Sequence, residues 1–339
     1  MSGSKPVVWV LSDGKPGHVS QSKGVVAALS SRREIHVEWV DCQLAFSFLK
    51  FLMRKIAKGL DQQSMSEKLT WFYRSLTLPQ SKPDLIISSG GNTLFALAAL
   101  GHRYQAKTIY SGTLKKYPAE LYDRVITVSS INTDNNLVLP LPPVDLSFPE
   151  RSATGVFQEA RERGNAIGAL LIGGDGAGYQ YQKEDWQRLI ALLEQNSQCQ
   201  VQWLLTTSRR TGQETESFLQ QKADQAGLSF LKAVWWGRRP EKVMAQFLSE
   251  CDFVLCTEDS LSMVAEAIYS GKPVFTFKPA SGGELTENDE MALSNYQSNG
   301  LIIRLEKEDR LLEIEEMKAE LPDVSGIIFE DVRQLLNLP

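Results

Sequence analysis

The sequence predicts an α/β protein made of two doubly wound domains, each built on a parallel sheet, that face a cleft. Strand-like and helix-like segments alternate twice along the chain, which is the pattern of parallel sheets covered by helices. The chain has 339 residues, more than one compact core usually accommodates, so two domains are expected. Four of the expected strands also run directly into a turn rich in glycine or hydroxyl side chains that opens a helix.

The first alternation predicts a domain over residues 1–145. The expected elements are the strand Val7–Leu11, a helix near Gln21–Ser30, the strand His36–Val40, an apolar helical stretch, the strand Asp84–Ile87, a helix near Thr93–Leu100, and the strands Lys107–Tyr110 and Arg124–Val128. Repeated proline follows in Leu139–Val144, with Pro149 and a polar stretch to Asn165 behind it. Because proline continues neither a helix nor a central strand, we expect this segment to connect the domains.

The second alternation predicts a similar, Rossmann-like domain over residues 146–330. Its expected strands are Ala169–Ile172, Gln200–Thr206, Leu231–Trp235, Asp252–Cys256 and Pro273–Phe277, and its expected helices are Glu184–Gln195, Gly212–Ala226, Pro240–Glu250 and Ser262–Ser270. The last residues, 331–339, are expected to form a helix that crosses back to the first domain.

Composition and charge argue against several classes of function. A net charge of −5 gives no electrostatic reason to bind nucleic acid. No apolar run approaches the roughly 20 residues that span a bilayer, and no signal peptide is recognisable. The cysteines Cys42, Cys199, Cys251 and Cys256 are scattered and form no Cys-x-x-Cys pair. We therefore expect a cytoplasmic protein in a reducing compartment, without structural zinc and without a nucleic-acid partner.

Each of the four glycine- or hydroxyl-rich turns is a candidate anion site. Such a turn lies at the carboxyl end of a parallel strand, and the helix that follows presents unpaired N–H groups and the positive end of its dipole. Glycine is also common there because backbones crowd, which is the alternative for any single turn. Two turns fall in each half of the chain: Ser12–His18, Ser88–Thr93, Gly173–Gly178 and Thr257–Ser262.

The most specific stretch is Cys251–Phe277, in which a strand, a hydroxyl-rich turn, a helix with one glutamate and a Gly-x-Pro follow one another. It resembles the nucleotide-sugar site of GT-B glycosyltransferases, especially the lipid-linked N-acetylglucosaminyltransferase of peptidoglycan synthesis. The resemblance implies that Glu266, five residues before Gly271, holds the ribose of the donor. It also implies that Ser260 and Ser262 of the turn contact the donor. An ionised carboxylate suits the ribose because it accepts hydrogen bonds from two neighbouring hydroxyls. The alternatives are a solvent-facing glutamate and a turn whose side chains only cap the helix.

Two further turns of the second domain are expected to hold the diphosphate of the donor. The loop with Gly173, Gly174 and Gly176 resembles the glycine-rich turn that closes over the pyrophosphate in the same enzymes. Arg209 and Arg210 follow another strand end, where a guanidinium can clamp a diphosphate with paired donors. The alternative for these two arginines is a solvated turn.

The first turn, Ser12–His18, supplies the candidate catalytic residues. Together with Thr257–Met263 it resembles a bacterial family that carries the label of a mitochondrial fission factor; this resemblance covers nearly the whole chain and implies a GT-B fold. An imidazole titrates near neutrality, so His18 is expected to act as general base on an acceptor hydroxyl. Asp13 is the alternative base or the group that orients the imidazole. The structural alternative is that His18 only caps or packs at the start of a helix.

The acceptor is expected to meet two glycine-containing loops of the first domain. We expect an inverting, metal-independent glycosyl transfer in which backbone amides and Arg210 stabilise the departing nucleoside diphosphate. The absence of an Asp-x-Asp motif agrees with this, and because the nucleotide sugar is a substrate, no cofactor is expected. The acceptor-side residues are Gly14, Lys15 and Gly17 in the first loop and Gly90, Gly91 and Asn92 in the second.

Residues 44–60 form a candidate membrane face. On a helix, their apolar stripe lies beside basic residues spaced by four, the pattern of a helix in an anionic membrane surface. The stripe consists of Phe48, Leu49, Leu52, Met53, Ile56 and Leu60, and the basic side of Lys50, Arg54 and Lys58. Packing against the domain core is the favoured alternative, although Phe46 and Phe51 fall outside the stripe. Membrane contact would place the protein at the inner membrane, near a lipid-linked or envelope acceptor.

Two other functions fit the same residues. The GT-B scaffold also serves sugar-nucleotide epimerases and hydrolases, which share the donor site. The family label suggests a non-catalytic, membrane-associated binding protein on a retired enzyme scaffold. Conversion of the donor without any acceptor would identify an epimerase or a hydrolase, and the intact His18, Glu266 and glycine loops favour an enzyme.

Overall fold

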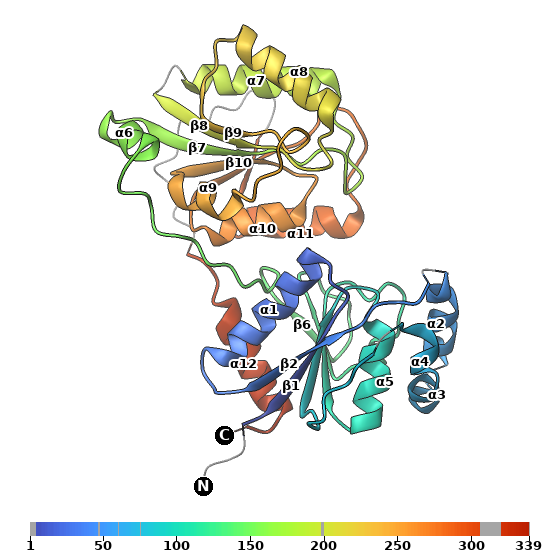
Figure 1. The fold of residues 1–339 in the computed structure, drawn as a ribbon. Helices are drawn as coiled ribbons and strands as arrows, with labels where there is room; N and C mark the ends of the chain where they lie inside the picture. Colours follow the sequence, from blue (N-terminus) through green and yellow to red (C-terminus); the bar gives the residue numbers. More distant parts are fainter. Residues whose placement is uncertain are drawn as a thin grey trace. The chain divides into compact units, whose positions relative to one another are not determined.

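The computed structural model describes residues 5–46, 48–59, 61–74, 76–197, 200–305 and 320–338. The chain forms two compact units, one of Met1–Asp145 with Pro322–Pro339 and one of Leu146–Leu321. Each unit holds one six-stranded parallel sheet with helices on both faces (Figure 1). The expected fold class, two Rossmann-like α/β domains, is therefore confirmed. Leu60 of the apolar stripe and Cys199 lie outside the described residues.

The sheet of the first unit has the strand order β2-β1-β3-β4-β5-β6, with all neighbours parallel. Strands that are covered on both faces read as near-continuous apolar runs, and β1 and β3 are buried in this way. The sequence does not predict the edge strand β6, because three residues are too short for a periodic pattern. The strands are β1 (Val7–Ser12), β2 (His36–Asp41), β3 (Leu85–Ser89), β4 (Lys107–Ser111), β5 (Arg124–Thr127) and β6 (Asn136–Val138).

The C-terminal helix α12 belongs to the first unit. It packs against α1 on one face of the sheet, while α5 and the short helices α2 to α4 cover the other face (Figure 1). Arg124 Nε of β5 donates a hydrogen bond to Asp331 Oδ2 of α12 at 2.8 Å. The expected boundary of the second domain at residue 330 is therefore wrong, because the chain returns to the first unit from Pro322. The helices are α1 (Pro16–Ser30), α2 (Leu49–Lys58), α3 (Gln62–Glu67), α4 (Leu69–Phe72), α5 (Leu94–Tyr104), the 3₁₀ turn η1 (Ala119–Leu121) and α12 (Val324–Leu335).

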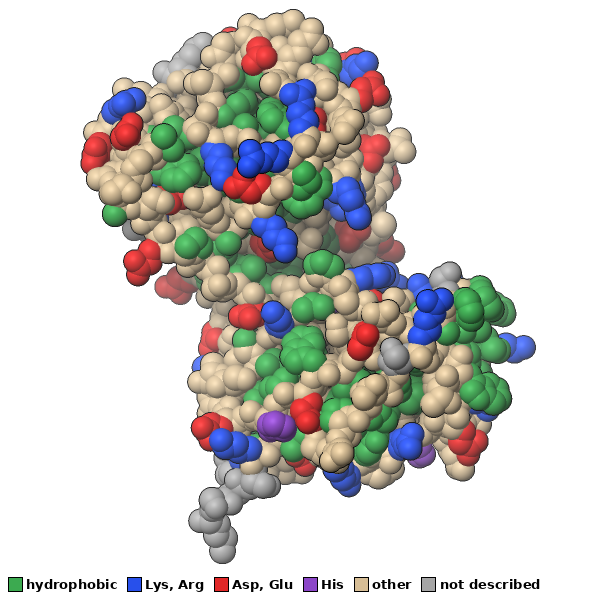
Figure 2. All heavy atoms as spheres, viewed as in Figure 1, with side chains coloured by type: hydrophobic (Ala, Val, Ile, Leu, Met, Phe, Trp, Pro, Cys, Tyr) green, Lys and Arg blue, Asp and Glu red, His purple; other side chains and the backbone are tan. Residues whose placement is uncertain are grey.

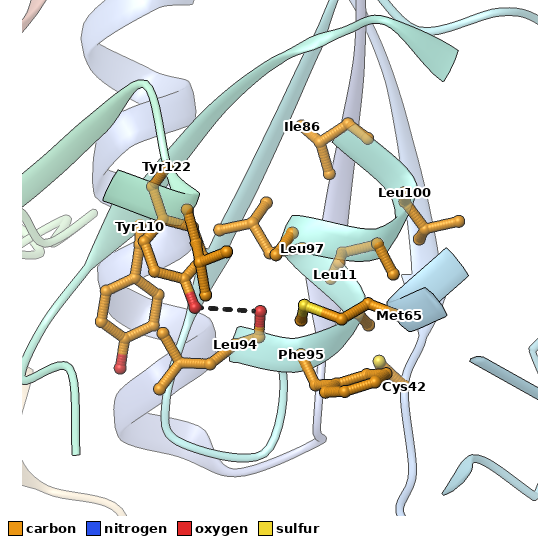
Figure 3. Close-up of a cluster of buried hydrophobic side chains, with 14 of the residues drawn as sticks. Leu11, Cys42, Met65, Ile86, Leu94, Phe95, Leu97, Leu100, Tyr110 and Tyr122 are labelled. Carbon is orange, nitrogen blue, oxygen red and sulfur yellow. Dashed lines mark hydrogen bonds between the residues drawn. The ribbon is translucent and has the colours of Figure 1, made fainter. Parts of the chain in front are cut away.

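The core of the first unit anchors α5 and the loop before it. Residues Leu94–Gly101 are all buried, as expected for a helix that is apolar all round. Figure 3 shows this helix surrounded by side chains of other elements, among them Cys42. At its first turn, the Tyr122 hydroxyl donates a hydrogen bond to the Leu94 carbonyl at 3.1 Å. The loop Gly90–Thr93, which leads into α5, is therefore held by a well-packed helix.

The sheet of the second unit has the order β12-β11-β10-β7-β8-β9 and is also parallel throughout. Helices α7 and α8 lie on one face, and α9, α10 and α11 lie on the other (Figure 1). The elements are α6 (Val156–Glu162), β7 (Ala166–Leu171), α7 (Lys183–Ser197), β8 (Val201–Thr206), α8 (Gln213–Gln225), β9 (Phe230–Val234), α9 (Met244–Glu250), β10 (Phe253–Thr257), α10 (Leu261–Tyr269), β11 (Val274–Phe277), α11 (Glu287–Ser298) and β12 (Ile303–Arg304).

Helix α6 lies within the stretch expected to connect the domains. The stretch is polar, which favours a loop, but Phe157 of α6 is buried and the helix packs on β7. Glu250, itself buried, fixes the segment from a distant part of the chain. Its carboxylate accepts hydrogen bonds from the Ser152 N–H at 2.7 Å and from Arg161 Nη1 at 2.9 Å. This long-range contact orders a segment that the local pattern predicts as irregular.

Each sheet has one switch point, where consecutive connections leave for opposite faces. In the first unit it lies between β1 and β3, and in the second between β7 and β10. Loops diverge at such a point, and ligands of open α/β sheets bind outside the carboxyl ends of the strands there. The four glycine- or hydroxyl-rich turns follow these same four strands, so both candidate sites lie at switch points.

We predict that Gly24→Ala destabilises the first unit. An added Cβ would lie 2.3 Å from the backbone nitrogen of Val144 and 2.4 Å from the carbonyl carbon of Pro143. Neither backbone atom can yield without moving the segment, so the free energy of unfolding should fall by about 1–3 kcal/mol. Urea denaturation measures this. Gly17→Ala is the control in the same helix, because no described heavy atom lies within 4 Å of its Cβ position. Equal stability of the two variants would contradict the account.

Candidate functional site

Asp13 and His18 form a hydrogen-bonded pair at the carboxyl end of β1. His18 Nδ1 lies 2.9 Å from Asp13 Oδ1 and 3.0 Å from Oδ2. Helix α1 begins at Pro16 rather than near Gln21, so His18 stands in the first helical turn and not in a loop. The Asp13 side chain is 1% exposed, whereas that of His18 is 32% exposed. An ionised carboxylate only accepts hydrogen bonds, so its bond with His18 places a proton on Nδ1 of the ring.

The loop after β3 completes the surroundings of this pair. Asn92 Nδ2 donates a hydrogen bond to Asp13 Oδ2 at 2.9 Å. Gly90 has a φ of +89°, and a Cβ there would lie 2.0 Å from His18 Nδ1, so only glycine lets the loop lie against the imidazole. The Lys15 N–H donates to Asp13 Oδ1 at 3.2 Å, and its ammonium lies 3.9 Å from Oδ2. The structure therefore gathers three of the acceptor-side residues around the pair.

The remaining acceptor-side glycines are less directly placed. Gly14 takes a left-handed φ of +75°, which shapes the turn before α1, and Gly17 lies inside that helix. The Cβ position of Gly91 lies 3.2 Å from the side chain of Lys115. Among the described residues, none of these three glycines contacts the side chains of Asp13 and His18.

In the second unit, the glycines after β7 serve close packing. A Cβ on Gly173 would lie 2.0 Å from Asp259 Oδ2, and one on Gly174 would lie 2.6 Å from the backbone of Arg210. The Cβ position of Gly176 is 3.1 Å from the Asp259 carbonyl. The Gly173 N–H donates to Thr257 Oγ1 at 2.8 Å, so this amide is already paired within the protein. These close approaches agree with the crowding alternative for the three glycines.

The two arginines after β8 have different surroundings. Arg210 Nη2 donates a hydrogen bond to the buried carboxylate of Asp259, and the Arg210 side chain is still 43% exposed. Arg209 is exposed and has no ion pair among the described residues. The turn itself is fixed because the hydroxyls of Ser208 and Thr211 donate to the Gly173 carbonyl. The structure therefore joins Arg210, and not Arg209, to the glycine loop.

Helix α10 begins without a side-chain cap. Ser260 stands at the N-cap position, but no cap hydrogen bond is formed by its side chain. Its Oγ lies instead 3.3 Å from Oγ of Ser262. The expectation that the turn's side chains cap this helix is therefore wrong for Ser260. No described residue accepts a hydrogen bond from the first N–H groups of α10, and unpaired groups of this kind can bind an anion.

Glu266 lies on α10, one helical turn after Ser262 and on the same face. Its side chain is half-buried and has no hydrogen-bond or ion-pair partner among the described residues. Burial raises the pKa of this carboxyl above its usual value. The arrangement differs from that of a solvated surface glutamate, because a half-buried acceptor without a partner can take hydrogen bonds from ligand hydroxyls.

Sequence reasoning missed the roles of Thr257 and Asp259. Both lie in the turn after β10, and their partners, Gly173 and Arg210, follow other strands. Asp259 also keeps Oδ1 buried without a partner among the described residues. The only local signal was the position of two polar side chains at the end of a buried strand.

The described residues also bear on the metal and membrane expectations. Among them, no group of three or more His, Cys, Asp and Glu side chains has the geometry to hold a metal ion. In that same part of the chain, no helix is both long and apolar enough to cross a membrane.

We predict that Glu266→Gln makes the protein more stable at neutral pH. Because its pKa is raised, the folded protein holds a proton that the unfolded chain has already released, so wild-type stability falls as pH rises from the usual glutamate pKa through the raised one. Glutamine carries no ionisable group, so the variant should not lose stability in this way as pH rises. Urea denaturation between about pH 4 and about pH 8 should show the two curves separating. Glu194→Gln, at an exposed position of α7, should behave as wild type, and identical curves for all three proteins would contradict the account.

Two solved structures match nearly the whole chain. UDP-GlcNAc 2-epimerase from Methanocaldococcus jannaschii is 12% identical, with a TM-score of 0.57, and the match covers 98% of this chain and 99% of that one. MurG of Acinetobacter baumannii is 15% identical, with a TM-score of 0.45, and the match covers 98% and 92%. The first match shows the fold, and the expected GT-B class is thereby confirmed.

The match to a protein family includes residues of both units. No curated protein matches the chain. A family model described as "Mitochondrial fission ELM1" matches residues 16–291, a span that includes His18 of the first unit and Glu266 of the second. The resemblance noted in the sequence is therefore confirmed, and the chain belongs to the mitochondrial fission ELM1 family.

Proposed function

We propose that the protein is a glycosyltransferase that moves a sugar from a nucleoside-diphosphate sugar to an acceptor hydroxyl. The observation that carries the proposal is Glu266, a half-buried carboxylate to which the described residues offer no partner, one turn behind the uncapped start of α10. A nucleoside diphosphate offers the matching chemistry, because its phosphates suit a helix N-terminus and its ribose offers two neighbouring hydroxyls.

The second unit would bind the donor. The first amides of α10 and the exposed part of the Arg210 guanidinium would face the diphosphate, with the hydroxyls of Ser260 and Ser262 beside it. Asp259 would hold Arg210 in position. Because these groups neutralise the charge of the departing diphosphate, we propose that the transfer needs no metal ion. Gly173, Gly174 and Gly176 would shape the loop rather than donate to the pyrophosphate.

The first unit would activate the acceptor. His18 Nε2 would take the proton of the acceptor hydroxyl while its oxygen forms a bond to the anomeric carbon and the bond to the diphosphate breaks. Asp13 would hold the ring through Nδ1 and stabilise the imidazolium that forms. A single displacement of this kind inverts the anomeric configuration.

A sugar-nucleotide epimerase or hydrolase is the second candidate. The solved structure with the higher TM-score above is named a UDP-GlcNAc 2-epimerase, which favours this class by fold alone. Incubation with the donor alone distinguishes the two. An epimerase or a hydrolase converts the nucleotide sugar without an acceptor, whereas a transferase leaves it intact.

A non-catalytic, membrane-associated binding protein is the third candidate, suggested by the family description. The close fit of Gly90 against His18 argues for an enzyme, because a retired site needs no glycine at that position.

We also propose that the protein works in the cytoplasm, on an acceptor that a membrane lipid carries. The nucleotide base, the sugar and the acceptor are to be identified by screening candidate compounds for binding.

We predict that His18→Ala abolishes transfer and spares donor binding. Loss of the general base should lower turnover by at least about 100-fold, while the donor affinity stays within about twofold because the donor contacts lie on the second unit. The donor is first found by the thermal shift that nucleotide sugars cause. Turnover and calorimetry then measure the two effects. His36→Ala, an exposed histidine of β2, is the control and should keep full turnover. Equal turnover of wild type and His18→Ala would remove His18 from the mechanism.

We predict that donor binding depends on the ionised form of Glu266. Glu266→Ala should weaken binding by about 10- to 100-fold, as expected for lost hydrogen bonds to a charged group. In the wild type, affinity should fall as pH drops through the raised pKa of this carboxyl, above the range usual for glutamate. Glu266→Gln should bind weakly and without this dependence. Calorimetry over a pH series measures all three, with Glu194→Gln as control. A wild-type affinity that is independent of pH would contradict the role.

A further inference from the structure

The first unit carries a cluster of exposed apolar side chains that the proposed reaction does not use. Phe48, Phe51 and Trp71 are 73%, 77% and 69% exposed. Of the five exposed aromatic residues in the described ranges, four lie between residues 46 and 71, and the fifth is Trp39. Figure 2 shows apolar side chains gathered over α2 with basic side chains around them. We call this cluster the aromatic patch; it consists of Phe46, Phe48, Phe51, Leu52 and Trp71.

Helix α2 has apolar residues both on the side that faces the core and on the side that faces solvent. Met53 and Ala57 are buried in the core, and Leu49 and Ile56 pack against it. Phe48 and Leu52 of the same expected stripe are exposed, and so is Phe51. The favoured alternative, core packing, therefore holds for only part of the stripe. The outward side of α2 remains apolar without serving the fold.

The aromatic patch is held in place by the structure. The rings of Phe46 and Phe48 stack with centroids 5.5 Å apart, and the Arg74 guanidinium lies 5.5 Å from the Phe46 ring. Arg74 Nε also donates to the Ala45 carbonyl at 3.0 Å. The main chain before Phe46 pairs with the segment at buried Tyr73 through an isolated antiparallel bridge. Exposed apolar clusters built on a fixed scaffold in this way mark interaction surfaces.

The charge around the aromatic patch has the opposite sign to that of the whole chain. Residues 44–74 hold six basic and two acidic side chains, whereas the protein has a net charge of −5. Lys50, Lys55 and Lys58 of α2 form no ion pair with any described residue. Uncompensated lysines beside exposed aromatic rings attract an anionic surface into which the rings can insert.

We propose that the aromatic patch docks the protein on an anionic phospholipid bilayer. The rings of Phe48, Phe51 and Trp71 would enter the boundary between head groups and acyl chains, where Trp and Phe are favoured. The lysines of α2 would lie at the phosphates. A fluid interface suits protruding side chains, because it adapts to their shape. The docking does not depend on the proposed transfer, although it would bring the first unit to acceptors in the membrane.

Vesicle flotation without any nucleotide tests the docking separately from the reaction. The vesicles are phosphatidylcholine alone, or phosphatidylcholine with about one third phosphatidylglycerol. The full-length protein should float with the anionic vesicles only. Phe48→Ser combined with Phe51→Ser should lower its partition coefficient by at least about tenfold. Trp39→Ser is the matched control, an exposed aromatic residue of the same unit outside the aromatic patch, and should float as wild type.

A second variant tests the charge. Lys55→Glu combined with Lys58→Glu should lower binding to the anionic vesicles by about tenfold or more. Absence of binding to the anionic vesicles, or equal binding by wild type and the double Ser variant, would overturn the proposal. So would a wild-type dimer that the double Ser variant converts to a monomer without any vesicle binding, because the aromatic patch would then join two copies. The circular dichroism spectrum of each variant should match that of the wild type. The outcomes above then reflect the changed surface side chains and not a loss of folding.

Discussion

In each unit, hydrogen bonding joins the loops that follow the two strands at the switch point. Asn92 of the loop after β3 donates to Asp13 after β1, and Gly173 after β7 donates to Thr257 at the end of β10. The connections leave these strands for opposite faces of the sheet, and these bonds link the loops at the point where they part. The bonds fix the carboxylate that faces His18 and the turn that opens α10. The proposed chemistry of both units depends on them.

One glycine in each candidate site allows a close approach between the loop backbone and a polar side chain. The backbone at Gly90 lies against the His18 imidazole, and the backbone at Gly173 lies against the Asp259 carboxylate. A methyl group at either place would displace a polar side chain that the site uses. At these two positions, the structure explains the glycine by packing of the loop backbone against a polar side chain. In the proposed function, the uncapped start of α10 binds the anion.

The fold was largely predictable because buried parallel strands leave a strong apolar signal, as in β1 and β3. The pair of Asp13 and His18 was also within reach, since five residues of a strand-to-helix turn can bring two side chains together. Helix α6 was not predictable from the local sequence. Its Arg161 donates a hydrogen bond to Glu250, which lies 89 positions further along the chain. The pairing of Arg210 with Asp259 escaped for the same reason: the two residues follow different strands and meet only in the assembled sheet.

The central claim is that the start of α10 and Glu266 together bind a nucleoside diphosphate. The most direct measurement is a crystal structure with the nucleoside diphosphate that raises the melting temperature most. The account predicts phosphate oxygens at the first amides of α10 and the ribose hydroxyls within hydrogen-bond distance of the Glu266 carboxylate. A nucleotide bound elsewhere on the chain, or one whose ribose leaves Glu266 without contact, would contradict it.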